Sequence, residues 1–148
     1  KLLLMNFSKI IGSKNFLIIG VDLRKEKDIM EKAYNDSEGI TAKFNKNILN
    51  GINKKTGLNF DTNDFDHKAY FNEEKNRIEM HLVSKRNQQI YLSDKQIKIF
   101  KGETIHTENS YKYSISEFKN LTNKSGYETI QVLTDDKKYF SIFFLKVK

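Results

Sequence analysis

GETIHTENSYKY, residues 102–113, has the alternating character of an extended strand. Side chains on a strand point to its two faces in turn, so a carboxylate and a hydroxyl two residues apart share one face. Such a pair can hold a small ligand that carries two ring nitrogens, although a solvated strand would have the same pattern. One face is predicted to carry Thr104, His106, Glu108 and Ser110, and the other Ile105, Thr107, Asn109 and Tyr111.

The segment before this strand also has a period of two. Between residues 67 and 100, the runs KAYF, RIEMHLV, QQIYL and QIKIF are separated by the polar segments EEKN, SKRN and SDK. Short alternating runs bounded by polar turns are typical of antiparallel strands. We therefore predict a small antiparallel sheet whose strands lead into residues 102–113.

The C-terminal segment predicts a helix followed by two strands. Ser114 or Ser116 is expected to cap the helix, Phe118 and Leu121 to face the core, and Gly126 to end it. TIQVLTDD and YFSIFFLKV then predict an antiparallel pair of strands around the turn DDKK, residues 135–138.

The N-terminal segment predicts a helix and a buried strand. Apolar residues recur at helical spacing over residues 3–11, and Gly12 is expected to end the helix in a left-handed conformation. FLIIGVDL, residues 16–23, is a continuous apolar run typical of a strand buried on both faces of a parallel sheet. Ligands of such sheets lie beyond the carboxyl ends of the strands, so the residues after Asp22 are expected near a site.

Two helices are predicted between this strand and the sheet. Asp28 is expected to cap a short helix through Tyr34, and Gly57 to end a longer helix that follows the breaker NDSEG. The inward-facing residues are predicted to be Ile29, Met30 and Ala33 in the first helix, and Ile40, Phe44, Ile48, Leu49 and Ile52 in the second.

Composition excludes several classes of protein. The net charge of +7 comes almost entirely from scattered lysines, with only three arginines, so no nucleic-acid partner is predicted. No apolar run approaches the roughly 20 residues of a membrane span, and the opening residues lack the features of a signal peptide. The chain has no cysteine, which fits a cytoplasmic location.

Because the chain begins at Lys1 with an uncapped apolar pattern, we expect it to be a fragment.

The sequence also carries motifs that bear on a metal site or a hydrolase activity. EMH, residues 79–81, and HTE, residues 106–108, each place a carboxylate and a histidine on one strand face. The sequence does not fix the pairing of these strands, and a half-solvated sheet carries such residues without a metal, so no metal site is predicted. The sequence contains no GxSxG, HExxH, Walker or GxGxxG motif.

Four separated motifs carry a resemblance to a known family. They are GVDLRKEKDIMEKAYNDSEGITAKFNKNIL, NRIEMHLVS, GETIHTENSYKY and TDDKKYFSIFFL. In unbroken order from about Leu2 to Val147, the chain resembles the C-terminal half of the histidine-specific, S-adenosylmethionine-dependent methyltransferases. These enzymes make Nα-trimethylhistidine for ergothioneine biosynthesis.

The resemblance implies an α/β fold, the C-terminal part of a class I (Rossmann-like) methyltransferase sheet with an inserted α+β substrate-binding domain. Residues 1–24 would be the last part of the methyltransferase core before the insertion. Residues 25–113 would form the inserted substrate-binding domain, and residues 114–148 would belong to the core again. It implies S-adenosyl-L-methionine as cofactor and L-histidine as substrate. The residues that bind the cofactor are expected upstream of Lys1, so the fragment is expected to be inactive alone.

The resemblance also implies a set of substrate-binding residues and no catalytic side chain. Tyr34 matches the tyrosine that holds the α-carboxylate of the substrate, and Thr41 and Met80 match positions that line the imidazole side of the pocket. Glu108 and Ser110 match the pair that hydrogen-bonds the imidazole, whose two nitrogens need one acceptor and one donor. A non-catalytic amino-acid-binding or interaction domain of a methyltransferase-like protein is the alternative, and the sequence leaves the oligomeric state open.

Overall fold

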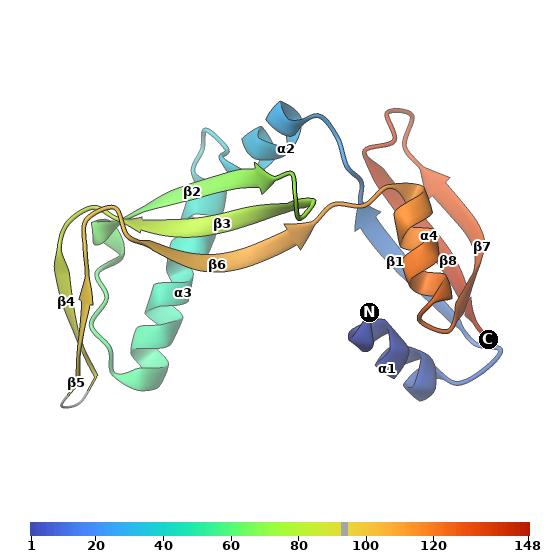
Figure 1. Ribbon diagram of the computed structural model, residues 1–148, viewed down its shortest axis with the longest axis horizontal. Helices are drawn as coiled ribbons and strands as arrows, with labels where there is room; N and C mark the ends of the chain where they lie inside the picture. The colour runs from blue at the N-terminus through green and yellow to red at the C-terminus, as the bar shows by residue number, and fades with distance from the viewer. Residues whose placement is uncertain (93–94) are drawn as a thin grey trace. The chain divides into compact units, whose positions relative to one another are not determined.

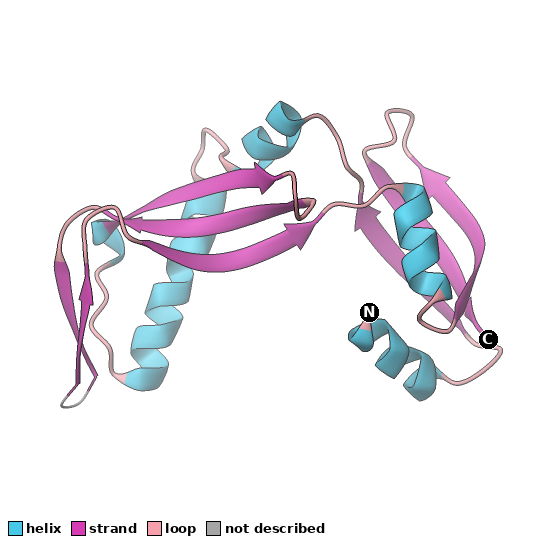
Figure 2. Ribbon diagram, viewed as in Figure 1, coloured by secondary structure: helices cyan, strands magenta, loops and turns pink. Residues whose placement is uncertain are grey.

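The computed structural model describes residues 1–92 and 95–148, which form two compact units. The terminal unit comprises Lys1–Lys25 and Lys112–Lys148, and the central unit comprises Glu26–Tyr111. Helices and strands of each unit are labelled in Figure 1 and coloured by type in Figure 2. Because both ends of the chain lie in the terminal unit, the central unit is a continuous insertion between its two parts.

The terminal unit is a three-stranded antiparallel sheet with two helices. Its strand order is β1-β8-β7, with β8 paired to both neighbours. The predicted helices and strands are confirmed with these bounds: α1 (Leu2–Ile11), β1 (Phe16–Asp22), α4 (Ile115–Asn123), β7 (Tyr127–Thr134) and β8 (Phe140–Val147).

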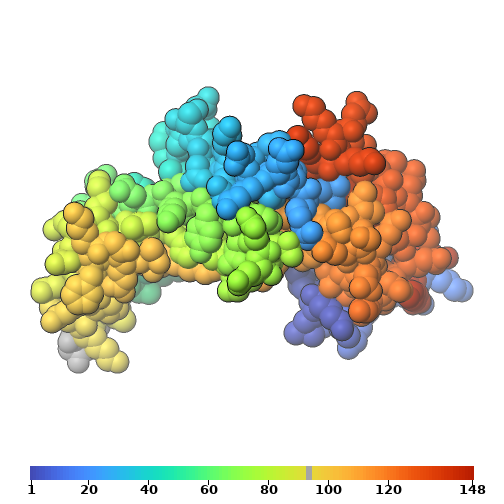
Figure 3. All heavy atoms as spheres, turned by 45° about the horizontal axis from the view of Figure 1, so that its top comes forward, coloured from blue at the N-terminus to red at the C-terminus, as the bar shows by residue number. Residues whose placement is uncertain are grey.

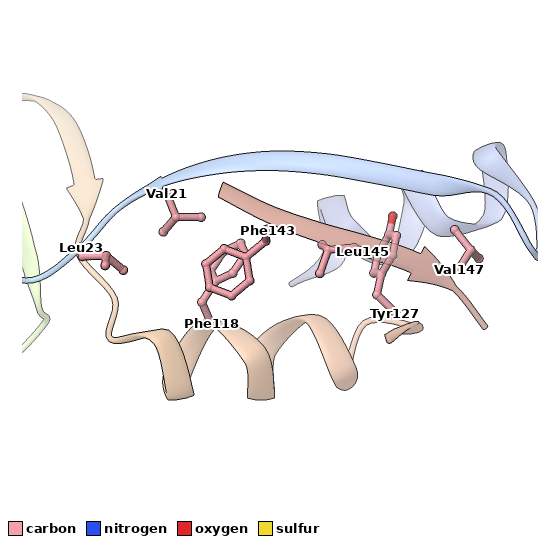
Figure 4. Packing of buried hydrophobic residues seen from close by; sticks show 7 residues of the cluster. All are labelled: Val21, Leu23, Phe118, Tyr127, Phe143, Leu145 and Val147. Carbon is pink, nitrogen blue, oxygen red and sulfur yellow. The ribbon is translucent and has the colours of Figure 1, made fainter. Parts of the chain in front are cut away.

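Helix α4 covers one face of this sheet. Ser114 caps the helix in a capping box with Glu117, which satisfies backbone donors at its first turn. Figure 4 shows Phe118 pointing from α4 toward Phe143 of β8, and their ring centroids lie 4.7 Å apart. The buried cluster consists of Val21, Leu23, Phe118, Tyr127, Phe143, Leu145 and Val147.

Three predictions for the terminal unit are wrong in detail. Gly12 has φ 80° and ψ 161°, which is a positive φ outside the left-handed helical region. Helix α4 ends at Asn123, and Gly126 instead takes a φ of 92° where the chain turns into β7. Strand β1 is not buried on both faces, since Phe16 and Ile18 are 64% and 62% exposed. Its one partner among the described residues is β8, which is antiparallel.

An ion-paired cluster holds the end of β1. Lys112 has no exposed side-chain surface, and its Nζ lies 2.6 Å from Asp22 Oδ2. Lys25 Nζ lies 2.5 Å from Asp22 Oδ1. Burial raises the pKa of Asp22, but the hydrogen bonds from Lys112 and Lys25 outweigh it and leave this pKa below its ordinary value. The carboxylate thus links the chain segments at both boundaries of the terminal unit.

Among the described residues, the central unit contains two antiparallel sheets, two α-helices and one short 3₁₀ helix. One sheet has the order β2-β3-β6 and the other pairs β4 with β5, so the single sheet predicted for these strands is two sheets. The elements are α2 (Lys27–Tyr34), α3 (Ile40–Thr56), the short 3₁₀ helix η1 (Thr62–Asp64), β2 (Phe65–Asn72), β3 (Arg77–Ser84), β4 (Gln88–Leu92), β5 (Lys95–Ile99) and β6 (Thr104–Tyr111).

The helices of the central unit lie where the sequence predicts them, but their buried faces differ. Helix α2 starts one residue before Asp28 and buries Met30 against β2, while Ile29 and Ala33 are exposed. The blue atoms of α2 form part of the outer surface in Figure 3. Helix α3 ends as predicted at Gly57, which is in the left-handed conformation. It buries Asn45 and Leu49, whereas Ile40, Phe44 and Ile48 are exposed.

Among the described residues, no helix has both the length and the apolar composition needed to cross a membrane.

Candidate functional site

A β-bulge in β6 decides which side chains share a face. Met80 pairs with Glu108 and His81 with His106, so Thr107 is an extra residue between them. Thr107 Oγ1 donates a hydrogen bond to the Met80 carbonyl oxygen at 2.9 Å, which holds the bulge. Residues directly opposite one another share a face, and consecutive residues do not. His106 and Glu108 therefore lie on opposite faces, and the predicted single row of Thr104, His106, Glu108 and Ser110 is wrong.

Glu108 and Ser110 lie on the face that the helices cover. Glu108 is opposite Met80, and Ser110 is opposite Ile78. Met80 and Ile78 are buried in one apolar cluster, against which Tyr34 packs. The Tyr34 hydroxyl donates a hydrogen bond to Ser110 Oγ at 2.8 Å, so two residues 76 positions apart in sequence meet at this face.

Tyr34 is positioned by the attachment of α2 to the edge of β2. The Asn35 side chain donates to the Ala69 carbonyl oxygen and accepts from the Ala69 amide, at 2.9 and 3.1 Å. One turn earlier, Glu31 Oε1 accepts from the Phe71 amide at 2.9 Å. These contacts satisfy backbone groups of an edge strand and fix the last turn of α2, which carries Tyr34.

Asn45 and His67 connect the two helices to the sheet. His67 Nε2 lies 2.8 Å from the Tyr34 carbonyl oxygen, which only accepts, so Nε2 carries the proton. Asn45 Nδ2 lies 3.0 Å from His67 Nδ1 and 3.2 Å from the His81 carbonyl oxygen, and donates to both. A buried amide of α3 thus holds a histidine of β2 in one tautomer beside Tyr34.

A pocket of about 250 Å³ opens between α3 and β6, next to Glu108. Its apolar wall is formed by Phe44 and Ile48, which the sequence pattern assigns to the core. An anionic carboxylate beside an aromatic ring suits a small ligand that has an N–H donor on a flat apolar body. The pocket is lined by Phe44, Asn45, Asn47, Ile48, Thr107 and Glu108.

Thr41 lies at the start of α3 and binds an aspartate. Asp36 Oδ1 accepts from the Thr41 amide at 2.9 Å, and Oδ2 from the Ile40 amide at 2.7 Å. Hydrogen bonds from the side chain and backbone of Thr41, then from the Ile40 backbone, lower the pKa of Asp36 from 3.8 to about 2. Asp36 therefore satisfies backbone donors at the start of α3, and Thr41 is not among the residues that line the pocket.

Four of the five predicted site residues, Tyr34, Met80, Glu108 and Ser110, lie on one face of the β2-β3-β6 sheet and its helix α2. Thr41 lies in the first turn of α3. Phe44, Asn45 and His67 also contribute to this region, and the sequence pattern did not predict them as site residues. One signal was available for Asn45, because a polar residue directly beside an apolar helical stripe is often buried and hydrogen-bonded.

Comparison with known proteins gives a consistent result. A family model described as histidine-specific methyltransferase, SAM-dependent, matches residues 1–147. A histidine N-alpha-methyltransferase of Mycolicibacterium smegmatis is 35% identical over 99 residues, 66% of this chain and 31% of the relative. A histidine N-alpha-methyltransferase of Mycobacterium tuberculosis is 32% identical over 128 residues, 85% of this chain and 40% of the relative.

A more distant relative is ergothioneine biosynthesis protein 1 of Schizosaccharomyces pombe, which is 27% identical over 128 residues, 86% of this chain and 17% of the relative. The chain thus spans well under half the length of each of these relatives. Since the family model covers nearly all of its residues, the chain belongs to the histidine-specific, SAM-dependent methyltransferase family.

Proposed function

We propose that the protein is an S-adenosylmethionine-dependent N-methyltransferase that acts on the α-amino group of L-histidine and yields Nα-trimethylhistidine. This chain would provide most of the histidine site. The observation that carries the proposal is the hydrogen bond of Tyr34 to Ser110, two strand positions from the carboxylate of Glu108 at the pocket. The names of the two mycobacterial relatives support the same substrate.

Recognition of the imidazole ring is assigned to Glu108 and Ser110. A neutral imidazole has one N–H donor and one lone-pair acceptor, so a carboxylate and a hydroxyl can satisfy both nitrogens. In this proposal, Glu108 accepts from the ring N–H, and the Ser110 hydroxyl donates to the other nitrogen. Glu108 is exposed and Ser110 is half-buried in this structure. Once a bound amino acid covers them, one without ring nitrogens would leave these groups unpaired, at a cost of about 1–3 kcal/mol for each.

Tyr34, Met80 and Thr41 are assigned supporting roles. Tyr34 would hold the α-carboxylate, and its hydroxyl, which donates to Ser110 in this structure, has to exchange that bond when histidine binds. Met80 is buried opposite Glu108, which supports a role as an apolar wall. Thr41 precedes the pocket-lining Phe44 by three residues on α3, so its contact with the ring would come from the start of that helix.

The chemistry that this chain would provide is positioning. S-adenosylmethionine, bound mainly by residues outside this chain, supplies the methyl group when present. The residues of this chain would hold the histidine so that its neutral amine points at that group, with water excluded from the pocket. Because the amine itself is the nucleophile, no nucleophilic side chain is assigned.

We also propose that the terminal unit is the end of a Rossmann-like sheet and that residues 25–113 are the inserted substrate-binding domain. The exposed Phe16 and Ile18 and the edge of β1, which has no partner among residues 1–92 and 95–148, support a larger sheet in the whole protein. The compact unit Glu26–Tyr111 supports the insertion. A cytoplasmic location belongs to the same proposal, because a chain without cysteine needs no oxidising compartment.

The test is a product assay with the full-length gene product. Isotopically labelled S-adenosylmethionine is supplied with each common amino acid in turn, and methylated products are identified by mass spectrometry. We expect label in histidine above all others. Glu108→Ala removes the acceptor and should lower kcat/KM for histidine about 5- to 150-fold, the equivalent of about 1–3 kcal/mol for one lost hydrogen bond in the occupied site. Glu128→Ala, on an exposed position of β7, is the matched control. Preferential methylation of another amino acid would refute the proposed substrate.

A further inference from the structure

The face of the β2-β3-β6 sheet opposite the pocket carries a cluster of ionisable side chains. Glu79 and His81 are two residues apart on β3 and share this face, and His106 of β6 lies directly opposite His81. The bulge at Thr107 brings His106 to this face while Glu108 remains on the other. One ligand atom from each of Glu79, His81 and His106 lies within 4.8 Å of the other two.

Glu79 is a buried carboxylate held by neighbours on β2 and β3. Arg77 Nη2 and Nε donate to its Oε1 at 2.6 and 2.8 Å, and the Tyr70 hydroxyl donates to its Oε2 at 2.7 Å. These hydrogen bonds from Tyr70 and Arg77 lower the pKa of Glu79 to about 2. Oε1 also accepts from Asn72 Nδ2 at 3.1 Å, so Oε2, which lies 3.4 Å from His81 Nε2, is the oxygen left for a further ligand beside the Tyr70 bond.

His81 presents an imidazole with an unsatisfied nitrogen. Its side chain is 11% exposed, and its Nε2 lies 3.4 Å from Glu79 Oε2. Its Nδ1 is buried and has no hydrogen-bond partner among residues 1–92 and 95–148. A buried ring nitrogen without a partner is costly, and a bound ion is one way in which native proteins satisfy such a group.

His106 is the exposed member of the cluster. Its ring stacks on that of His81 with centroids 4.5 Å apart and planes 16° from parallel. Its Nε2 lies 3.1 Å from the Glu108 carbonyl oxygen, which only accepts, so this nitrogen carries the proton. The lone pair of His106 is therefore on Nδ1, and the neutral ring can serve as a metal ligand through that atom.

We propose that Glu79, His81 and His106 form a binding site for one divalent transition-metal ion of the zinc type, on the sheet face opposite the pocket. Two imidazoles and one carboxylate are ligands that zinc-type ions commonly take. Mg²⁺ and Ca²⁺ instead prefer sites made of oxygen ligands. Arg77 and Tyr70 would act as outer partners that orient the carboxylate.

The three ligand atoms lie close enough together to share one ion. Ligand atoms bonded to one zinc ion at roughly 2.1 Å each lie no more than about 4.2 Å apart, and those of Glu79, His81 and His106 lie within 4.8 Å of one another. A small movement of the exposed His106 ring can supply any remaining closure. The guanidinium of Arg77 beside Glu79 reduces the attraction for a cation, so we expect weaker binding than at structural zinc sites.

Titration of the chain with ZnCl₂, followed by calorimetry and by imidazole ¹⁵N NMR, tests the proposal. One equivalent of zinc should bind, and the ring nitrogens of His81 and His106 should shift while those of His67 do not. His67 is the third histidine of the chain and lies on the pocket face, bonded to Tyr34 and Asn45. The NMR result distinguishes the three rings in the wild-type chain, without any variant that has to fold.

Variants provide the quantitative test. Loss of a side chain that only orients a metal ligand typically lowers metal affinity about 10- to 100-fold. His106 is proposed as a ligand itself, so His106→Ala should weaken zinc binding by at least about tenfold. His106 is exposed, so this change leaves the apolar core intact. His67→Gln should leave zinc affinity within about twofold, because His67 supplies no ligand. Equal zinc affinity in His106→Ala, or no heat and no ring shift in the wild-type chain at millimolar zinc, overturns the proposal.

Discussion

The Tyr34 hydroxyl lies 2.8 Å from Ser110 Oγ and donates a hydrogen bond to it, joining the end of α2 to β6. Tyr34→Phe removes the donor and keeps the ring in its apolar cluster. We expect the free energy of unfolding of the central unit to fall by about 0.5–1.5 kcal/mol, measured by urea titration. Tyr91→Phe removes an exposed hydroxyl of the same unit and should change it by less than about 0.5 kcal/mol. Equal effects of the two changes would mean that the Tyr34 bond adds nothing.

Asn45 connects α3 to His67 and to the backbone of β3, so its loss should affect stability as well as the pocket. Asn45→Ala leaves the buried Nδ1 of His67 and the His81 carbonyl oxygen without this donor. We expect a loss of about 1–3 kcal/mol in the free energy of unfolding, measured in urea. Asn47→Ala, two residues along the same helix, removes a bond to exposed Asn50 and is the control, which should cost less than about 0.5 kcal/mol in the free energy of unfolding.

The buried Lys112 depends on the Asp22 carboxylate 2.6 Å away. Breaking a buried ion pair by removal of one partner commonly lowers the free energy of unfolding by about 3–5 kcal/mol. Because the Asp22 side chain is 34% exposed and partly screened by solvent, we expect Asp22→Ala to lower the free energy of unfolding by about 2 kcal/mol, measured by urea titration. The double variant Asp22→Ala/Lys112→Met should recover most of this loss, since it no longer buries a charge. A double variant as unstable as Asp22→Ala would contradict this role for the ion pair.

The start of α3 should be sensitive to acid through Asp36. Its pKa is lowered from 3.8 to about 2 by hydrogen bonds from Thr41 and Ile40. A lowered pKa in the folded state means that the contribution to stability is complete above pH 3.8 and is lost as the pH falls toward 2. Urea titrations across this window should show a shallower fall for Asp36→Ala than for wild type. Parallel curves for Asp36→Ala and wild type would contradict this role of Asp36.

Much of the fold follows from local sequence pattern. The period-two runs predict β2, β3, β4 and β5, and Ser114 with Glu117 predicts the start of α4, because these signals depend on neighbouring residues. The bulge at Thr107 has no such signal. An extra residue in one strand is defined only by the register with its partner, so strict alternation placed His106 and Glu108 on one face.

The sequence could not predict which apolar residues of α3 are buried, for a related reason. The apolar stripe on this helix is wider than the strip that packs on the sheet, and tertiary contacts choose which part is buried. Asn45 bonds inward, so Phe44 and Ile48 line the pocket instead of the core. The proposed roles of Tyr34, Thr41, Met80, Glu108 and Ser110 came from four family motifs, since composition and periodicity carry no information about a ligand.

Recognition of the histidine ring by Glu108 is tested most directly by calorimetric titration of the full-length gene product with L-histidine in the presence of S-adenosylmethionine. Wild type is compared with Glu108→Ala and with Glu128→Ala as control. We predict that Glu108→Ala weakens histidine affinity about 5- to 150-fold, while the control binds as wild type does. Unchanged affinity in Glu108→Ala would contradict the assignment of this carboxylate to the histidine site.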